Sequence, residues 1–259
     1  AVRSPVGKAG GGLAAVHPAD LGAAVIAELI DRSQIDPGVV DDVMVGNVDS
    51  VGPQAGCLAR TAWLVADMPE HVPGTTIDRR CGSSQQAVHF AAQAIMSGQA
   101  DVVVAGGIQS MSQVPMMQAF SVPGVDDFDP FTSSPGWVKR YGDARFDQFD
   151  GAEQIARRWD ISRSDMEEFA LESHRRATNA IANGVFNDEI VPVAGLAHDE
   201  CPRTADADKM RSLRALKPNG RITAAVSCQI TDAAAMLLVA SEDAVERYGM
   251  SPLARISHL

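Results

Sequence analysis

Residues 76–87 of the chain read Thr76-Ile77-Asp78-Arg79-Arg80-Cys81-Gly82-Ser83-Ser84-Gln85-Gln86-Ala87. The β-branched residues that open this stretch predict a short strand over residues 75–78. Apolar residues at helical spacing follow from Ser83 to Ser97, and Gly98 is a typical stop signal. A strand that turns sharply into a helix predicts an α/β layer, with Cys81 in the turn directly before the helix.

The sequence on both sides of this stretch alternates between the same two patterns. Helices are expected over residues 19–31 and 55–66, and short apolar strands over residues 43–48 and 102–104, the last closed by Gly106 and Gly107. Strands that alternate with helices are typical of layered α/β folds. Residues 1–112 are therefore predicted to form the first part of an α/β domain with a substantially parallel sheet.

The pattern changes at Gln113. Residues 113–231 are partly polar and irregular, but they contain two expected helices, one over residues 151–159 and one that is capped by Ser162 and runs to Ala182. A strand is expected over residues 189–193. We therefore expect residues 113–231 to be an inserted loop domain. Residues 232–259 then complete the first domain, with a strand at 233–239, a helix at 241–249 and a short strand at 254–258.

Composition excludes several classes of protein. The chain has 259 residues, of which 46% are hydrophobic, so it can bury a core. It has 33 acidic and 22 basic side chains and a net charge of −11, which argues against a general nucleic-acid binder. Its longest apolar runs, such as residues 233–240, are too short to span a bilayer, and no signal peptide opens the sequence. These features predict a cytoplasmic protein with no nucleic-acid or membrane partner.

Cysteine and histidine usage predicts neither a disulfide framework nor a metal site. The four cysteines have irregular spacing without a CxxC pair, and the six histidines are scattered without an HExxH motif. Such usage indicates a reduced, metal-free protein. The remaining question is whether one of the cysteines is a nucleophile.

Cys81 is the strongest candidate nucleophile. At the start of a helix, unpaired backbone N–H groups and the helix dipole favour negative charge, and they would stabilise a thiolate. Gly82 permits a sharp turn and a close approach of substrate. The alternative, which the local pattern leaves open, is a buried structural cysteine. Cys57 is expected to pack in its helix, Cys201 to lie on a polar loop and Cys228 to line a pocket.

Several motifs, in order along the chain, resemble those of the thiolase family, whose members condense or cleave acyl-CoA thioesters. They are residues 3–8 (Arg-Ser-Pro-Val-Gly-Lys), 78–87 around Cys81, 105–112 (Ala-Gly-Gly-Ile-Gln-Ser-Met-Ser), 184–193 and 222–235. The resemblance implies two similar α/β domains with a loop domain inserted in the first. It also implies acyl-CoA and CoA as substrates, no bound cofactor or metal, and an acyl group carried on Cys81.

The resemblance also implies catalytic groups that no stretch of this sequence matches. Thiolases carry an Asn-Glu-Ala-Phe motif, a Gly-His-Pro histidine and a Cys-x-Gly-Gly cysteine on the second domain, and we expect that domain to be absent from this chain. The chain alone is therefore expected to be inactive or weak, because partners that act as a unit lose most of the rate when some are removed. It is expected to form a homo-oligomer or to need a separate chain that supplies the second domain.

CoA carries phosphates, so its binding needs local positive charge on an acidic protein. Residues 203–221 contain six basic and two acidic side chains. The resemblance implies that Arg203 and Cys228 contact CoA, and Lys209 and Trp137 are further candidates, with Lys139 and Arg140 beside them. Residues 111–117 are candidates for the acyl tunnel. The alternatives are a solvated basic surface and methionines that only fill the core.

Five residues depart from the family pattern. Cys57 replaces a usual Asn, Gln109 a common Glu, Val226 an Asn, Cys228 a Ser and Ala233 a Gly. Cysteine forms weaker hydrogen bonds than serine, and Ala233 would be strained if its backbone required a positive φ. These departures keep two alternatives open: a non-catalytic CoA-binding subunit that needs a partner chain, and a degenerate remnant without activity.

Overall fold

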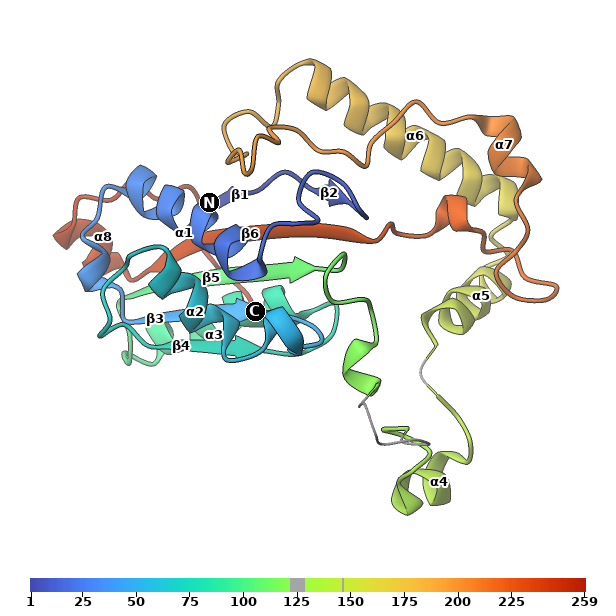
Figure 1. Cartoon of the computed structure of the whole chain (residues 1–259), viewed down its shortest axis with the longest axis horizontal. Helices are drawn as coiled ribbons and strands as arrows, with labels where there is room; N and C mark the ends of the chain where they lie inside the picture. The colour runs from blue at the N-terminus through green and yellow to red at the C-terminus, as the bar shows by residue number, and fades with distance from the viewer. Residues whose placement is uncertain (122–128, 146) are drawn as a thin grey trace. The chain divides into compact units, whose positions relative to one another are not determined.

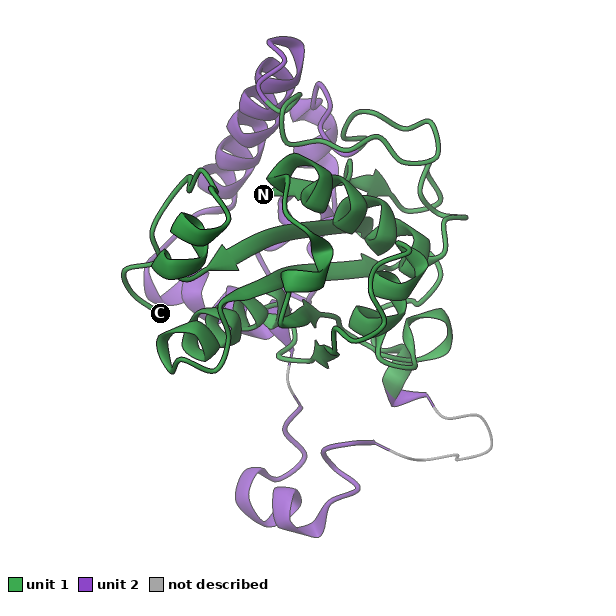
Figure 2. Ribbon diagram, turned by 90° about the vertical axis from the view of Figure 1, so that its left-hand side faces the viewer, with its two compact units in different colours: residues 1–119, 186–200, 230–259 green, residues 120–185, 201–229 purple. Residues whose placement is uncertain are grey.

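The computed structural model describes residues 1–121, 129–145 and 147–259. The chain forms two compact units (Figure 2). Unit 1 comprises residues 1–119, 186–200 and 230–259, and unit 2 comprises residues 120–185 and 201–229. Residues 122–128 and 146 of the expected insertion lie outside the described residues.

Unit 1 is built on a mixed sheet, with six strands among the described residues (Figure 1). The strands are β1 (Val2–Arg3), β2 (Gly7–Lys8), β3 (Asp42–Gly46), β4 (Gly74–Ile77), β5 (Val102–Ser110) and β6 (Thr231–Ala240). Their order is β1-β6-β5-β3-β4, with β2 also beside β6. β3 is parallel to β4 and β5, whereas β6 is antiparallel to β5, β1 and β2. The predicted parallel sheet is thus correct for β3, β4 and β5 and wrong for β6.

Helices cover both faces of this sheet. The main apolar cluster joins α1 (Pro18–Ser33), α2 (Leu58–Val65) and α8 (Glu242–Arg247) to one face, where Val43 and Val45 are fully buried. α3 (Ser83–Met96) packs on the opposite face in a smaller cluster with Met44 and Val103. Successive side chains of a strand point to opposite faces, which explains why neighbouring residues of β3 belong to different clusters.

Side chains cap the N-termini of several helices. Pro18 opens α1, and the ring of His17 accepts a hydrogen bond from the N–H of Ala19 at 3.2 Å. Ser241 caps α8 by accepting from the N–H of Ala244. These caps satisfy N–H groups that have no partner within the helix.

Two of the predicted strands differ from the structure, one in its length and one in its existence. β5 does not stop at Gly106 but continues to Ser110, because β6 pairs with it over its whole length, whereas β3 pairs with it only as far as Gly107. Residues 254–258 form no strand. A strand needs a partner for its backbone groups, and the preceding strand β6 is already paired on both sides.

The predicted boundaries of the insertion also differ from the observed units. Residues 186–200 belong to unit 1 because Arg3 holds them to the N-terminal strands: its N–H donates to the carbonyl of Glu189 at 2.8 Å, and its carbonyl accepts from Val191 at 2.7 Å. The strand expected at 189–193 is reduced to isolated bridges. Residues 113–119 stay in unit 1 because Gln113 donates to the carbonyls of Ala14 and Val16.

The side chain of Arg3 reinforces this connection. Its Nε donates to Glu189 at 2.6 Å, and its two terminal nitrogens donate to Asp199 at 2.7 and 3.0 Å. Burial lowers the pKa of Arg3, but the hydrogen bonds to Asp199 and Glu189 outweigh it and the pKa lies above its usual value. We call Arg3, Glu189 and Asp199 the N-terminal clamp.

Unit 2 is helical in its described residues. Its helices are α4 (Pro135–Tyr141), α5 (Gln148–Arg158), α6 (Arg163–Ala182) and α7 (Ala207–Ser212). Ser162 and Asp165 form a capping box at the start of α6, as the sequence predicts for this helix. Within the described part of the chain, each helix is too short or too polar to cross a bilayer.

The N-terminal clamp yields a stability prediction. Arg3→Ala leaves Asp199 (9% exposed side chain) without its cation, and we expect unit 1 to lose roughly 2 kcal/mol of unfolding free energy in urea. Arg247→Ala is the matched control, because Arg247 and Asp101 lie 3.6 Å apart with exposed side chains; it should cost less than about 0.5 kcal/mol. Equal losses in the two variants would contradict the clamp.

Candidate active site

Cys81 lies in the turn between β4 and α3, directly before Gly82, the N-cap residue of α3. This is the position that the sequence predicts. The thiol residue is exposed, so it is not a buried structural cysteine. The N–H groups of Gly82 and Ser83 donate to the carbonyls of Arg79 and Arg80 at 3.1 and 3.0 Å, which closes the turn. Gly82 caps the helix without a side-chain hydrogen bond.

Two glycines let this turn approach the sheet. A Cβ atom on Gly46 would lie 2.3 Å from the backbone of Ser83 and Ser84, and a Cβ on Gly107 would lie 2.1 Å from the Ser84 hydroxyl oxygen. Gly46 and Gly107 are paired across β3 and β5. The N-terminus of α3 therefore sits on these two glycines, and Cys81 is held above the carboxyl ends of parallel strands, where α/β proteins commonly bind ligands.

A network of side-chain amides fixes the same edge of the sheet. Gln109 accepts from the N–H of Val48 at 3.0 Å and donates to its carbonyl at 3.2 Å. Buried Gln54 accepts from the N–H of Ser110 at 2.8 Å. The amide of Gln109 donates from its nitrogen and accepts at its oxygen, whereas an ionised glutamate could only accept. Gln109 therefore fits its place although the family commonly has Glu.

Asp49 is a site residue that the sequence analysis missed. It follows β3 in a left-handed conformation (φ 57°) and is only 2% exposed. Its Oδ2 accepts from the N–H of Met117 at 2.7 Å, and its Oδ1 lies 3.8 Å from Nη1 of Arg80, the residue before Cys81. An aspartate after a strand is an ordinary turn signal. Only the fold shows that this one is buried beside the turn that carries Cys81, which we call the nucleophile turn after its proposed role.

Two departures from the family pattern now have physical explanations. Cys57 caps α2 in a left-handed conformation (φ 60°), which asparagine adopts more readily than cysteine. The expectation that Cys57 packs in a helix is wrong, because the residue is exposed at the cap. Ala233 lies within β6 opposite Gln109, outside the positive-φ residues, so the suspected strain there is not found.

Unit 2 brings Arg203 close to the segment that carries Cys228. The carbonyl of Cys201 accepts from Arg203 at 3.4 Å and from the side chain of Gln229 at 3.3 Å. Cys228 is exposed beside Gln229. His174 of α6 is also near, since burial and the charge of Arg203 lower the pKa of His174. The carbonyl of Cys201 thus joins the segment that carries Arg203 to Gln229, the residue after Cys228.

The other two candidate CoA residues lie on separate helices of unit 2. Lys209 is exposed on α7. Trp137 on α4 packs between Phe131 and Tyr141, with ring centroids 4.9 and 4.7 Å away, and its Nε1 donates to the carbonyl of Ala144 at 2.8 Å. The ring of Trp137 is therefore half-buried in an aromatic cluster, which leaves less of it for stacking on a nucleotide.

Part of the basic stretch 203–221 serves unit 2 itself. Lys217 binds Asp147, the cap of α5, and lowers the pKa of that carboxyl. Arg211 pairs with Asp208 at 2.6 Å. The Arg221 guanidinium donates to the carbonyl of Ile161 at 2.6 Å, and buried Glu153 accepts from the N–H groups of Arg221 and Ile222 at 2.7 and 2.8 Å. The charge that the sequence shows is thus only partly available to a ligand.

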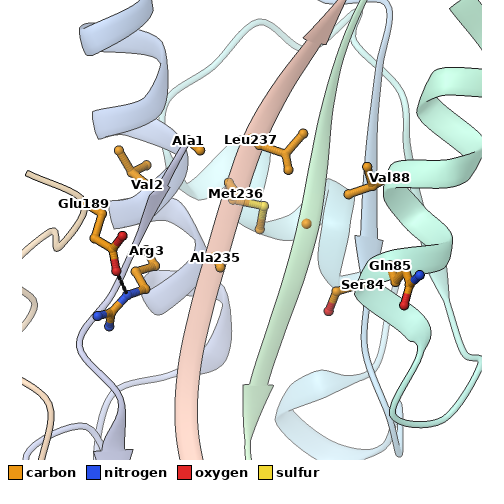
Figure 3. Close-up of a pocket in the computed structure, with 11 residues that line it drawn as sticks. Ala1, Val2, Arg3, Ser84, Gln85, Val88, Glu189, Ala235, Met236 and Leu237 are labelled. Atoms are coloured by element: carbon orange, nitrogen blue, oxygen red, sulfur yellow. Dashed lines mark hydrogen bonds and ion pairs between the residues drawn. The ribbon is translucent and has the colours of Figure 1, made fainter. Parts of the chain in front are cut away.

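A separate cavity lies on the α3 face of unit 1 (Figure 3). It has a volume of about 340 Å³, with Val88 on α3 and Ala235, Met236 and Leu237 on β6 among its lining residues. The Arg3–Glu189 ion pair borders one end. Ala235 is exposed in the middle of β6, so α3 does not cover the strand at this residue, whereas Leu237 and Val239 further along pack with α3.

Titratable groups do not gather into a metal site. Within residues 1–121, 129–145 and 147–259, no group of three or more His, Cys, Asp or Glu side chains could hold a metal ion. Over the same ranges, which include all four cysteines, no disulfide is formed.

The two glycines under α3 yield a prediction. Gly46→Ala forces the added methyl group against the backbone of Ser83 and Ser84, and we expect a loss of roughly 2–3 kcal/mol in urea unfolding. Gly12→Ala is the control in the same unit, because its Cβ would make ordinary contacts of 3.4–3.5 Å with Leu196. A Gly46→Ala variant as stable as Gly12→Ala would show that α3 does not rest on the sheet at this point.

Comparison with known proteins agrees with this geometry. Residues 1–243 match the family model "Thiolase, N-terminal domain". The chain is 51% identical over 264 residues to the steroid 3-ketoacyl-CoA thiolase FadA6 of Mycobacterium tuberculosis, covering 100% of this chain and 65% of that protein. It is 38% identical over 272 residues to the beta-ketothiolase BktB of Cupriavidus necator, covering 98% and 68%.

A solved structure gives the same result for the fold. The chain superposes on the Bacillus anthracis acetyl-CoA acetyltransferase with a TM-score of 0.81 and 31% sequence identity, covering 97% of this chain and 66% of that one. The chain therefore spans about two thirds of the length of the relatives that it matches. On the evidence of its motifs, its fold and these matches, the chain belongs to the thiolase family.

Proposed function

We propose that this chain carries the acyl-accepting half of a thiolase-type acyl-CoA acyltransferase, with Cys81 as the nucleophile. The observation that supports this most directly is the exposed thiol directly before the N-terminus of α3, in the motif that resembles the thiolase nucleophile. An exposed cysteine at a helix N-terminus is the arrangement that activates thiols for attack on carbonyl groups.

The proposed reaction has two stages. In thiolysis, the Cys81 thiolate attacks the C3 keto carbon of a 3-ketoacyl-CoA, and the keto oxygen becomes an oxyanion. Collapse of this intermediate breaks the C2–C3 bond, whose electron pair leaves on C2 of the departing CoA thioester; C2 takes up a proton, and the acyl group stays on Cys81. The thiol of a second CoA then attacks the acyl-cysteine, which releases Cys81 and the product thioester. The N–H groups of Gly82 and Ser83 already donate to the carbonyls of Arg79 and Arg80, so the donors proposed for the developing oxyanion are the N–H groups that follow them in the first turn of α3.

CoA recognition is proposed for unit 2. Arg203 and Gln229, the residue after Cys228, both donate to the carbonyl of Cys201, and Arg203 offers an exposed guanidinium suited to a phosphate. Lys209 is a second exposed cation. Trp137 is a weaker candidate because its ring is engaged with Phe131 and Tyr141.

The names of the relatives support a proposal for the direction and the substrate. FadA6 is named as a steroid 3-ketoacyl-CoA thiolase and shares 51% of aligned residues with this chain. We propose thiolysis of a 3-ketoacyl-CoA, with a steroid-derived acyl group as the first to test and acetyl-CoA condensation as the alternative direction. The histidine base and second cysteine of the family have no counterpart in the sequence, so activity of the 259 residues alone should be weak. We place the protein in the cytoplasm, where thiols stay reduced.

The first test is acyl transfer to Cys81. The chain is incubated with acetyl-CoA or acetoacetyl-CoA, and peptide mass spectrometry locates the acyl group. We expect an adduct at Cys81 and a far smaller one at Cys57 and Cys228, which are also exposed and serve as internal controls. Cys81→Ala should abolish the main adduct without changing the fold.

Three outcomes separate the alternatives. Acylation spread equally over the three exposed cysteines would overturn Cys81 as a specific nucleophile. Thiolysis that appears only when a thiolase C-terminal domain is added would indicate a subunit that needs a partner. CoA binding without any acylation, with or without that domain, would indicate a degenerate or non-catalytic CoA-binding protein.

We also propose that the cavity face described above is a contact surface for another domain, either a second copy of this chain or a thiolase C-terminal domain. The face is apolar over Val88, Ala235 and Leu237. Apolar surface of this kind favours association.

Association can be measured by light scattering at micromolar concentration. We expect an oligomer, and we expect Ala235→Glu to reduce its mass by placing a charge in the apolar face. Ala224→Glu, at an exposed position of unit 2, should not change the mass. A monomeric wild-type chain that also fails to bind an added C-terminal domain would refute the proposed surface.

A further inference from the structure

The nucleophile turn contains a buried charge that the reaction described so far does not use. Asp49 has a 2% exposed side chain. Its Oδ2 is hydrogen-bonded to the N–H of Met117, whereas its Oδ1 is buried and has no hydrogen-bond partner among the described residues. Nη1 of Arg80 faces Oδ1 at 3.8 Å. Burying a carboxylate is costly unless a cation compensates it, so this arrangement requires Arg80.

Backbone strain gathers around the same carboxylate. Asp49, Arg80 and Met117 have φ values of 57°, 51° and 71°. Residues other than glycine rarely adopt this left-handed conformation, and such residues cluster where surrounding structure fixes a functional geometry. Met117, Asp49 and Arg80, which contact one another in this order, are therefore all held in a rarely populated backbone conformation.

The contact chain ends at the nucleophile. Arg80 directly precedes Cys81, and its carbonyl accepts from both the N–H and the hydroxyl of Ser83, at 3.0 and 2.5 Å, in the first turn of α3. A change of the backbone at Arg80 would therefore move the thiol relative to the N–H groups of α3. Asp78 shares the hold on Arg80 from the exposed side, by accepting from its N–H at 2.8 Å.

We propose that Asp49 is a positioning residue for Cys81: through Arg80 it fixes the thiol against the N–H groups that stabilise the oxyanion. The inference rests on the proposed function, because it assumes that Cys81 receives an acyl group. Asp49 does not touch the reacting atoms. Its hydrogen bond from the N–H of Met117 ties the turn to the candidate acyl-tunnel segment, so both change together when the carboxylate is removed.

The test compares two reactions of Cys81 in the whole chain. Acetylation by a small aryl thioacetate needs the oxyanion donors but no CoA site, whereas alkylation by iodoacetamide needs only the thiolate. We expect Asp49→Asn to slow acetylation about tenfold, the scale expected for a misplaced nucleophile, and to leave alkylation within about twofold. A purely structural role would change the two rates in parallel or only the melting temperature.

Asp232→Asn is the matched control. Asp232 is also a fully buried carboxylate at this edge of the sheet, but it holds the N–H and hydroxyl of Ser112, at 2.8 and 2.6 Å, instead of the nucleophile turn. It should lower stability and leave the ratio of the two rates unchanged. Arg80→Gln provides a second variant in case Asp49→Asn does not fold, since the Arg80 side chain is 54% exposed; it should reproduce the loss of acetylation.

Every outcome bears on one of the proposals. A wild-type ratio in both Asp49→Asn and Arg80→Gln would overturn the positioning role. If the aryl thioacetate acetylates the wild type and acetyl-CoA does not, the CoA proposal is overturned. The variants then still decide the positioning role of Asp49. Failure of both acyl donors on the wild type would overturn both.

Discussion

The contact between the N-terminus of α3 and the paired glycines of β3 and β5 is the constraint on which the candidate active site depends. Gly46 and Gly107 leave no space for a side chain between the sheet and Ser83 or Ser84. This contact sets the height of the helix above the sheet and hence the place of Cys81. The amides of Gln109 and Gln54 then join the loops that leave β3 and β5. The place of Cys81 is thus set by main-chain contacts with the sheet, which fix a side chain better than a loop alone does.

In unit 2, charged side chains rather than glycine contacts hold neighbouring segments together. Its buried Glu153 accepts hydrogen bonds from the main chain of residues 221–222, and Arg221 donates in return to the carbonyls of Ala156 in α5 and Ile161 just after it. A stretch with six basic residues is therefore a mixture of structural cations and exposed ones, and counting charge along the sequence could not separate them.

The sequence could predict the elements that depend on local chemistry. A few adjacent residues determine the helix caps at Ser162 and Ser241, the turn at Cys81 and the family motifs. The sequence therefore predicts all of them. It could not predict features that depend on distant partners. The direction of β6, the attachment of residues 186–200 through Arg3, and the burial of Asp49 are set by residues more than 30 positions away. The strand expected at 254–258 is wrong for the same reason, since local alternation does not reveal whether a neighbour has a free edge.

The sheet also joins the two ends of the chain. Val2 pairs with Met236, and Lys8 with Thr231, whereas the strands and helix around Cys81 all come from residues 42–110. At about 5–20 residues per second of synthesis, the first strands wait roughly 10 to 50 s for their partner. The nucleophile turn can therefore form early, from local contacts, while the half of the sheet that holds the N-terminal clamp closes last.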